Sequence, residues 1–415
     1  MPSGTALAAG RRLIAPALRL KYGIQGVDIS DEDILRIRQL SNRRVLITPN
    51  HPSSAEPALM FYLSQRTGIP FYYVCCREIF ELCGGLWGRC LQKFGGYSIV
   101  RGVADRESFR VTRELMCKPD TKIVLFPEGE VYSQNDVLLP FQSGVIQLMF
   151  WAQEDLRKQH LDGSILLLPV AVKYRFTSSM EAPISRSMAR LEEALALSPA
   201  AGSDAYTRLR NIGIAVLTAI ERDYGLKPQP DTEDLNGRIM AIKEALIRRV
   251  SFALAIVERE GSKDSERTLS QRMRSLINAL HEVTSDSDAA SSTYETRLRA
   301  VQRERIQPLL NDLDRLANLI AIRDGYVSAL PTPERMVDTL RRLETEVLGK
   351  AYCTGPRRCR IRIGHPIDLA DYEVDYAGDK RGTVRVVTET LEGAVQALLD
   401  EMVAEDRVCL AEQAV

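Results

Sequence analysis

The sequence predicts an α/β fold in which a mixed sheet is flanked by helices and interrupted by a large all-helical insertion. Three observations lead to this fold class. Strand and helix signals alternate from residue 41 to about residue 176, helical periodicity alone follows from about 180 to 350, and one strand signal and one helix signal then return. A length of 415 residues is sufficient for such an organisation.

The first part of the chain carries alternating strand-like and helix-like runs. The predicted strands are Arg44–Pro49, Pro70–Cys76, Tyr97–Arg101, Lys122–Pro127 and Ile165–Phe176. The predicted helices between them are Ala55–Gln65, Ile79–Lys93, Arg106–Cys117 and Gly144–Lys158. Because the strands are separated by helices, we expect a layered arrangement with a largely buried sheet.

The segment 179–350 is predicted to be a helical bundle inserted into the α/β domain. Apolar residues recur there at helical spacing, as in Ile239, Ile242, Leu246 and Val250. The predicted strand Cys359–Gly364 and the predicted helix Val387–Val403 cannot form a stable domain by themselves. We therefore expect residues 1–178 and 351–415 to form one domain. The insertion is interpreted as a solvated bundle, with a membrane- or partner-binding surface as the alternative.

Composition narrows the classes of function. The formal net charge is zero and aromatic residues make up 6%, so no nucleic acid is expected as a partner. Four of the eight cysteines are close together: Cys75, Cys76, Cys83 and Cys90. The last three are spaced by seven residues, which predicts one helical face, but they form no CxxC pair. We expect reduced thiols, no metal site and a cytoplasmic protein.

Two segments bear on membrane contact. No run of 18 apolar residues occurs, so no transmembrane helix is predicted. The segment Ala6–Tyr22 mixes leucine and isoleucine with arginine and lysine, which is typical of a basic helix on an anionic membrane and equally of a helix packed on the domain. The apolar stripe in Ile79–Phe94 contains Trp87 and fits either a bilayer interface or a core helix.

The strongest candidate for a catalytic group is His51, in the segment NHPSSAE at residues 50–56. It follows the predicted strand Arg44–Pro49 directly, and Glu56 lies five residues after it. The junction between a strand and the next helix is where α/β proteins commonly carry reactive groups. A histidine with a carboxylate partner is a suitable general base near neutral pH, because the carboxylate fixes its tautomer and stabilises the imidazolium.

Three further blocks follow in order, and together the four resemble the glycerolipid acyltransferase family. They are a Gly-rich strand ending in Arg101 (GGYSIVRG, 95–102), the turn FPEG at 126–129, and the apolar strand LPVAV at 168–172. The resemblance covers roughly residues 40–176, and loosely 357–404. It implies an acyltransferase-type α/β fold and a peripheral membrane enzyme.

The resemblance also implies the chemistry. A fatty acyl group would pass from acyl-CoA or acyl carrier protein, both acyl thioesters, to a hydroxyl of glycerol 3-phosphate or a lysophospholipid, with no cofactor. His51 would act as the base and Glu56 would orient its ring. Arg101 would bind the phosphate of the acceptor, and Glu128, with Gly129 allowing close backbone approach, would hold the acceptor.

Two residues depart from the pattern of that family. Glu56 stands where the common form has aspartate, and Glu130 follows the FPEG turn where the family has Thr-Arg-Ser. The second change replaces an expected phosphate contact by a negative charge. Two other classes of function therefore stay open: a catalytically degenerate lipid-binding or scaffold protein with the same fold, and a thioesterase that uses water in place of the glycerol hydroxyl.

Overall fold

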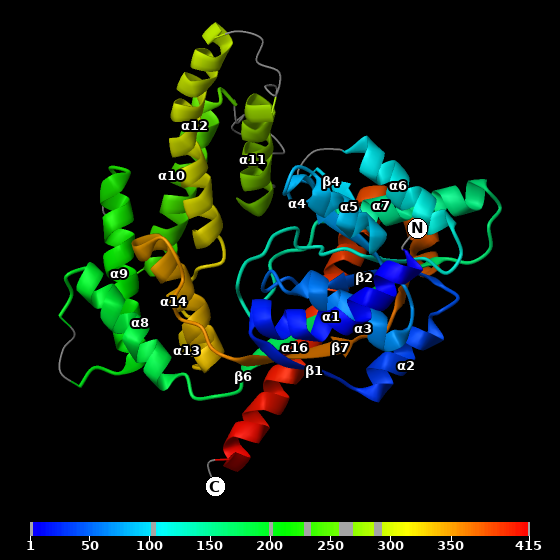
Figure 1. Ribbon diagram of the computed structural model, residues 1–415, viewed down its shortest axis with the longest axis horizontal. Coiled ribbons are helices and arrows are strands. Elements are labelled where there is room, and N and C mark those ends of the chain that lie inside the picture. The colour runs from blue at the N-terminus through cyan, green and yellow to red at the C-terminus, as the bar shows by residue number, and fades with distance from the viewer. Residues whose placement is uncertain are drawn as a thin grey trace. The chain divides into compact units, whose positions relative to one another are not determined.

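The computed structural model describes residues 3–100, 105–198, 202–227, 234–256, 269–285 and 293–413 (Figure 1). The chain divides into two compact units. One comprises Met1–Ser178 and Pro356–Val415, and the other comprises Ser179–Gly355. The first is an α/β unit, and in the described part of the second the regular elements are all helices.

The α/β unit is built on one eight-stranded sheet. Its strands, in chain order, are β1 (Ile24–Ile29), β2 (Arg44–Pro49), β3 (Tyr72–Cys76), β4 (Gly96–Ile99), β5 (Lys122–Val124), β6 (Ile165–Phe176), β7 (Arg357–Ile363) and β8 (Ile367–Asp368). The order across the sheet is β1-β7-β6-β2-β5-β3-β4, and β8 pairs with β6. Only the pairings of β6 with β7 and β8 are antiparallel among these strands. This mixed, mostly parallel sheet confirms the predicted fold class.

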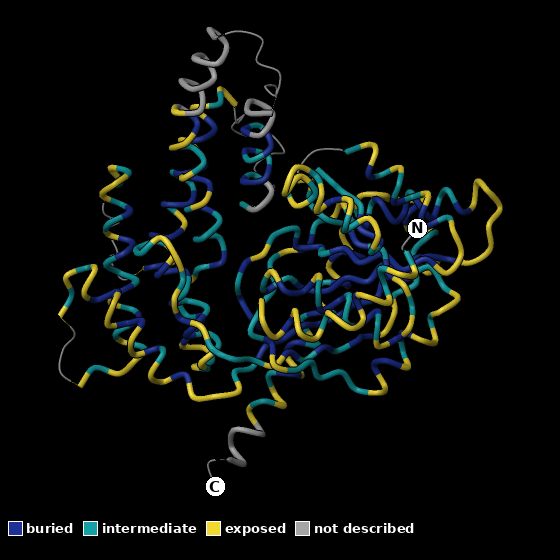
Figure 2. Tube along the Cα trace, viewed as in Figure 1, coloured by how far each residue is buried: buried dark blue, intermediate teal, exposed yellow. Residues whose placement is uncertain are grey.

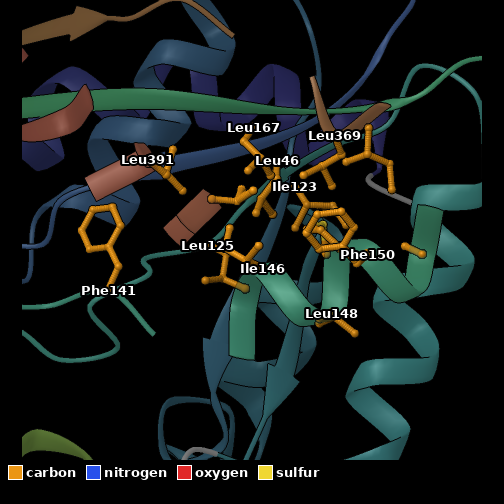
Figure 3. Close-up of a cluster of buried hydrophobic side chains, with 14 of the residues drawn as sticks. Leu46, Ile123, Leu125, Phe141, Ile146, Leu148, Phe150, Leu167, Leu369 and Leu391 are labelled. Atoms are coloured by element: carbon orange, nitrogen blue, oxygen red, sulfur yellow. The ribbon is translucent and has the colours of Figure 1, made fainter. Parts of the chain in front are cut away.

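Helices cover both faces of the sheet because neighbouring side chains of each strand point to opposite faces. Val45 and Ile47 of β2 pack with residues of α1 (Gly4–Tyr22), α2 (Asp31–Gln39) and α3 (Glu56–Thr67). Leu46 points the other way, toward residues of α6 (Arg106–Cys117), α7 (Ser143–Lys158) and α16 (Lys380–Gln413). Figure 3 shows Leu46, Ile123 and Leu167 of the sheet beside Ile146 and Phe150 of α7. The short η2 (Leu369–Tyr372) and α15 (Glu373–Gly378) complete this layer.

The helical unit contains α8 (Glu181–Ala194), α9 (Ala205–Asp223), α10 (Leu235–Ala253), α11 (Leu269–Ser285), α12 (Thr293–Leu319), α13 (Tyr326–Ala329) and α14 (Pro333–Leu348). Its core includes buried residues at helical spacing, such as Ile242, Leu246 and Val250 of α10. Figure 2 shows buried and more exposed stretches alternating along the described parts of these helices. The helical periodicity in the sequence therefore corresponds to a buried stripe. None of the helices in the described ranges is both long enough and apolar enough to cross a bilayer.

The predicted helix Ile79–Lys93 is wrong in one respect, because two short helices occur there. They are α4 (Arg77–Glu81) and α5 (Leu86–Lys93). The turn between them contains three successive residues with positive φ, at 55° for Cys83, 63° for Gly84 and 82° for Gly85. A right-handed helix cannot continue through such residues.

The predicted helical face of cysteines is also wrong. Cys76 is the last residue of β3, Cys83 lies in the turn, and Cys90 lies in α5. The seven-residue spacing does not place them on one face because no single helix includes all three.

Candidate active site

The candidate site lies where parallel strands end at the same edge of the sheet. β2 pairs in parallel with both β5 and β6, so the residues that follow β2 and β5 emerge side by side. Asn50 and His51 follow β2 directly, and the FPEG turn begins two residues after β5. The sheet thus brings together two of the sequence blocks, which are 70 or more residues apart.

His51 and Glu56 form a direct contact. The Nδ1 atom of His51 lies 2.8 Å from Oε2 of Glu56. The side chain of Glu56 is fully buried, whereas that of His51 remains 14% exposed. The imidazole also stacks on the ring of Phe126, with centroids 4.2 Å apart and an angle of 23° between the planes. The ring is therefore fixed on one face and at one nitrogen, and no hydrogen bond to Nε2 occurs among the described residues.

The carboxylate of Glu56 accepts hydrogen bonds from more than the histidine. The backbone N–H of Ser53 donates to Oε2 at 2.9 Å, and the Ser53 hydroxyl donates to Oε1 at 2.9 Å. The hydroxyl of Tyr174, near the end of β6, donates to Oε1 as well. A carboxylate is an acceptor with room for about four donors, so this set satisfies it. Each oxygen consequently has a defined direction, and Oε2 is the one that meets His51.

Asn50 fixes the end of β2 against β6. Its Nδ2 donates to the carbonyl oxygen of Val172 at 3.0 Å, and the N–H of Val172 donates back to its Oδ1 at 2.7 Å. Asn50 is fully buried. The side chain therefore continues the sheet pairing past Pro49 and holds the backbone from which His51 projects.

Glu128 is hydrogen-bonded to the backbone of His51, and its predicted contact with an acceptor stays a prediction. The residue is fully buried. One of its oxygens accepts from the N–H of His51 at 2.8 Å, and the other accepts from the N–H of Leu139 at 2.9 Å. Burial raises the pKa of Glu128 to about 8, while its hydrogen bonds with Tyr132, Leu139 and His51 act in the opposite direction. This geometry favours a positioning role, holding the backbone of His51.

Gly129 gives the FPEG turn its shape. Its φ is 72°, and its N–H donates to the carbonyl oxygen of Phe126 at 3.1 Å. A residue with a side chain is strained at this φ, so the turn that presents Phe126 and Glu128 depends on glycine. Arg101, the predicted phosphate contact, lies outside the described residues, and its role stays a prediction. β4 as described ends at Ile99.

Ser53 and Tyr174 were not predicted from the sequence. The spacing Ser53-x-x-Glu56 before an apolar run is the signature of a helix capping box, in which the Glu side chain accepts from the backbone N–H of the Ser. The structure contains that bond, from the N–H of Ser53 to Oε2 of Glu56, although α3 begins only at Glu56. Tyr174 offers no comparable signal, because it is 118 residues from Glu56 in the chain. In the part of the chain that is described, no group of three or more His, Cys, Asp or Glu side chains is placed to hold a metal ion.

Taken together, the α/β fold and a half-buried histidine oriented by a buried carboxylate define a class of proteins that can remove a proton from a bound nucleophile. Residues 28–173 match the family model described as Acyltransferase. The α/β unit therefore carries a domain of the acyltransferase family, the family of glycerolipid acyltransferases such as the lysophosphatidic acid and glycerol-3-phosphate acyltransferases. This confirms the resemblance, and it supports a general acyltransferase role. The comparison with curated proteins gave no match.

Proposed function

We propose that this protein transfers a fatty acyl group from acyl-CoA or acyl carrier protein to a hydroxyl of glycerol 3-phosphate or a lysophospholipid. The observation that supports it most is the His51–Glu56 pair, which lies within the acyltransferase-family domain and in which Nε2 of the ring has no hydrogen bond to any of the described residues. A glycerol hydroxyl is a weak nucleophile until a base takes its proton, and an oriented imidazole supplies that base.

In the proposed reaction, Nε2 of His51 accepts the proton of the acceptor hydroxyl. The oxygen then attacks the carbonyl carbon of the thioester and forms a tetrahedral intermediate. As this collapses, the C–S bond breaks, and the imidazolium returns its proton to the leaving thiolate. Glu56 stabilises the transient imidazolium through Nδ1. Atoms and charge balance with the two substrates alone, so the proposal includes no cofactor.

Arg101 belongs to the same proposal as the group that binds the phosphate of the acceptor, since a guanidinium presents a fork of donors to phosphate oxygens. Glu130, in the place of the arginine-containing family sequence, would repel a second phosphate oxygen. A lysophospholipid with a headgroup alcohol, whose phosphate is a diester with a single negative charge, would suffer less from that repulsion than a phosphomonoester such as glycerol 3-phosphate or lysophosphatidic acid would. We therefore favour a lysophospholipid with a headgroup over glycerol 3-phosphate as the acceptor.

A peripheral membrane location is also part of the proposal, and exposed apolar residues support it. Leu13 and Leu20 of α1 are 65% and 86% exposed, and Leu86 and Trp87 of α5 are 64% and 45% exposed. The N–H of Ser3, just before α1, donates to the carbonyl oxygen of Lys93 at 2.8 Å, which joins the start of α1 to the end of α5.

The charges of these two helices fit an anionic membrane. α1 and α5 contain no Asp or Glu, and their basic residues are all exposed: Arg11, Arg12, Arg19, Lys21, Arg89 and Lys93. Apolar side chains that enter the headgroup region beside cations are typical of helices at the surface of anionic bilayers.

An assay with labelled acyl-CoA and a panel of lysolipids tests the proposed reaction. The wild-type protein should form a diacyl lipid, and His51→Ala should lower the turnover by about 10²–10⁴-fold, the usual contribution of a general base. His365→Ala is the matched control, because His365 is exposed and lies outside the site. Release of free fatty acid alone would show a thioesterase instead, and tight lipid binding without turnover would show a lipid-binding or scaffold protein.

Flotation with vesicles tests the membrane face. Leu86→Ser together with Trp87→Ser should weaken binding to vesicles that contain phosphatidylserine, and added salt should weaken the binding of the wild-type protein. Val374→Ser is the control, since Val374 is 86% exposed but lies in α15. Equal binding by the double variant and the wild-type protein would exclude α5 as the contact.

A further inference from the structure

The carboxylate at position 56 is one methylene longer than the aspartate common in the family, and the structure shows what this length accommodates. Glu56 is the first residue of α3, and Oε2 reaches back to the N–H of Ser53 while also meeting Nδ1 of His51. An aspartate is shorter by about one C–C bond, roughly 1.5 Å, and cannot span the same set of donors. The longer side chain of Glu56 thus fits a site in which two further donors reach its other oxygen, Oε1.

The first extra donor is the hydroxyl of Ser53. It donates to Oε1 of Glu56 at 2.9 Å and accepts from the N–H of Ala55 at 3.1 Å. Since both ends of this hydroxyl are used within the turn that leads into α3, its direction is set by the local backbone. Ser53 therefore orients the Oε1 atom of Glu56 from the same segment of chain that carries His51.

The second extra donor is Tyr174, whose hydroxyl also lies 3.1 Å from that of Ser53, but whose backbone is held by a side chain outside the turn. Its N–H donates to Oδ1 of Asn135 at 2.7 Å, and its carbonyl oxygen accepts from Nδ2 of the same side chain at 2.7 Å. The guanidinium carbon of Arg357 lies 4.0 Å from the centroid of its ring. Burial raises the pKa of the Tyr174 hydroxyl well above its usual value, so it remains a donor at neutral pH.

We infer that Ser53 and Tyr174 are positioning residues that make this site specific for glutamate at position 56. They hold Oε1 so that Oε2 meets His51 along one direction. Neither touches the reacting atoms, and both act through Glu56 on the orientation and tautomer of the imidazole. This inference rests on the proposed function for its kinetic consequence, but not for its structural one.

A double-mutant cycle on Glu56→Asp and Tyr174→Phe tests the inference. With Glu56 present, Tyr174→Phe should lower kcat about tenfold, as expected for the loss of one hydrogen bond to a charged group, and should leave the KM for the thioester unchanged. In the Glu56→Asp background, the tyrosine has no carboxylate oxygen within reach, so the same change should alter kcat by less than about twofold. An equal effect in both backgrounds would overturn the inference.

The control is Tyr376→Phe, which also removes a buried tyrosine hydroxyl with a hydrogen bond. That hydroxyl accepts from Nε2 of Gln147 at 2.7 Å, on the sheet face that carries α7. The thermal midpoint of each variant separates loss of folding from loss of turnover. If Tyr174→Phe does not fold, Ser53→Ala replaces it in the same cycle, with the same expected pattern.

A second readout does not need turnover. The ring nitrogens of His51 can be observed by NMR after labelling of the four histidines with ¹⁵N. In the wild-type protein Nδ1 should carry the proton at neutral pH, and Tyr174→Phe should increase the share of the Nε2–H tautomer, while Tyr376→Phe should not. An unchanged tautomer in Tyr174→Phe would overturn the inference. If Tyr174→Phe shifts the tautomer but the wild-type protein has no turnover, the proposed function alone is overturned and the inference stands.

Discussion

Glu56 in the α/β unit and Glu344 in the helical unit are two fully buried glutamates that are held in closely similar ways. Glu344 accepts from the hydroxyl of Ser187 at 2.7 Å and from the N–H groups of Tyr352 and Cys353 at 2.6 and 2.8 Å. Glu56 likewise accepts from hydroxyl groups and a backbone N–H, but its remaining donor is the imidazole of His51.

The two glutamates differ in role: Glu344 holds backbone and side-chain groups in place, whereas Glu56 contacts a side chain that can be protonated. Hydroxyl and N–H donors stabilise a buried carboxylate and fix the chain around it, which at Glu344 ties residues 352 and 353 to α14 and α8. At Glu56 the same kind of donor set supports a ring that can take up a proton. Burial and satisfied hydrogen bonds are therefore insufficient to identify a functional carboxylate, and the titratable neighbour at a strand end is the informative feature.

The largest expected effect separates these two glutamates. Glu56→Gln should reduce turnover by about 10²–10⁴-fold, because an amide cannot stabilise the imidazolium and can favour the wrong tautomer. Glu344→Gln should leave kcat per folded molecule unchanged. Both should lose about 1–3 kcal/mol of stability, since an amide NH₂ group replaces one acceptor oxygen. Turnover and urea denaturation measured on the same preparations check this, and a similar loss of turnover in both variants would contradict it.

Glu128 is a third buried glutamate, and it makes the stability of the protein depend on pH. Because its pKa rises from an ordinary value of 4.5 to about 8, the folded protein keeps a proton that the unfolded chain releases between these values. Its contribution to stability is present below pH 4.5 and is lost as the pH rises through 8. Between about pH 6 and pH 8 the loss is on the order of 2–3 kcal/mol.

Glu128→Gln should remove this part of the pH dependence, although the variant is less stable at about pH 6, where the amide cannot accept from both N–H groups. Urea denaturation at about pH 6 and pH 8 provides the measurement, with Glu344→Gln as the reference. The same slope in Glu128→Gln and in the wild-type protein would show that another group titrates.

The parts of the fold that were predictable from the sequence have continuous apolar patterns. Arg44–Pro49 and Ile165–Phe176 were predicted with the bounds of β2 and β6, since each is a run of buried residues. β1 and α2 were not predicted. β1 contains Gly26 and Asp28, which are unfavourable in strands, and it is stabilised by its parallel pairing with β7, where Asp28 bonds to Arg358, 330 residues later.

The same distinction applies to the candidate site. The contact of His51 with Glu56 was predictable because it spans five residues of one turn. The hydrogen bonds of Tyr174 to Glu56 and of Glu128 to His51 were not, because they depend on which strands are neighbours in the sheet. The resemblance places Glu128 against the acceptor, which stays a prediction, and the structure adds that Glu128 is buried and bonded to the backbone N–H of His51.

The smallest expected effect compares two glycines with nearly the same backbone. Gly129 has a φ of 72° and Gly349, which ends α14, has a φ of 73°; the N–H of each donates to a carbonyl oxygen at 3.1 Å. Alanine at either position should cost about 1 kcal/mol, because its Cβ is strained at positive φ. Gly349→Ala should therefore lower the thermal midpoint without changing kcat. Gly129→Ala should lower both, since any relaxation of its turn shifts Glu128 and, through it, the backbone of His51. Equal kcat values for the two variants at equal folded fraction would mean that the turn does not position the histidine.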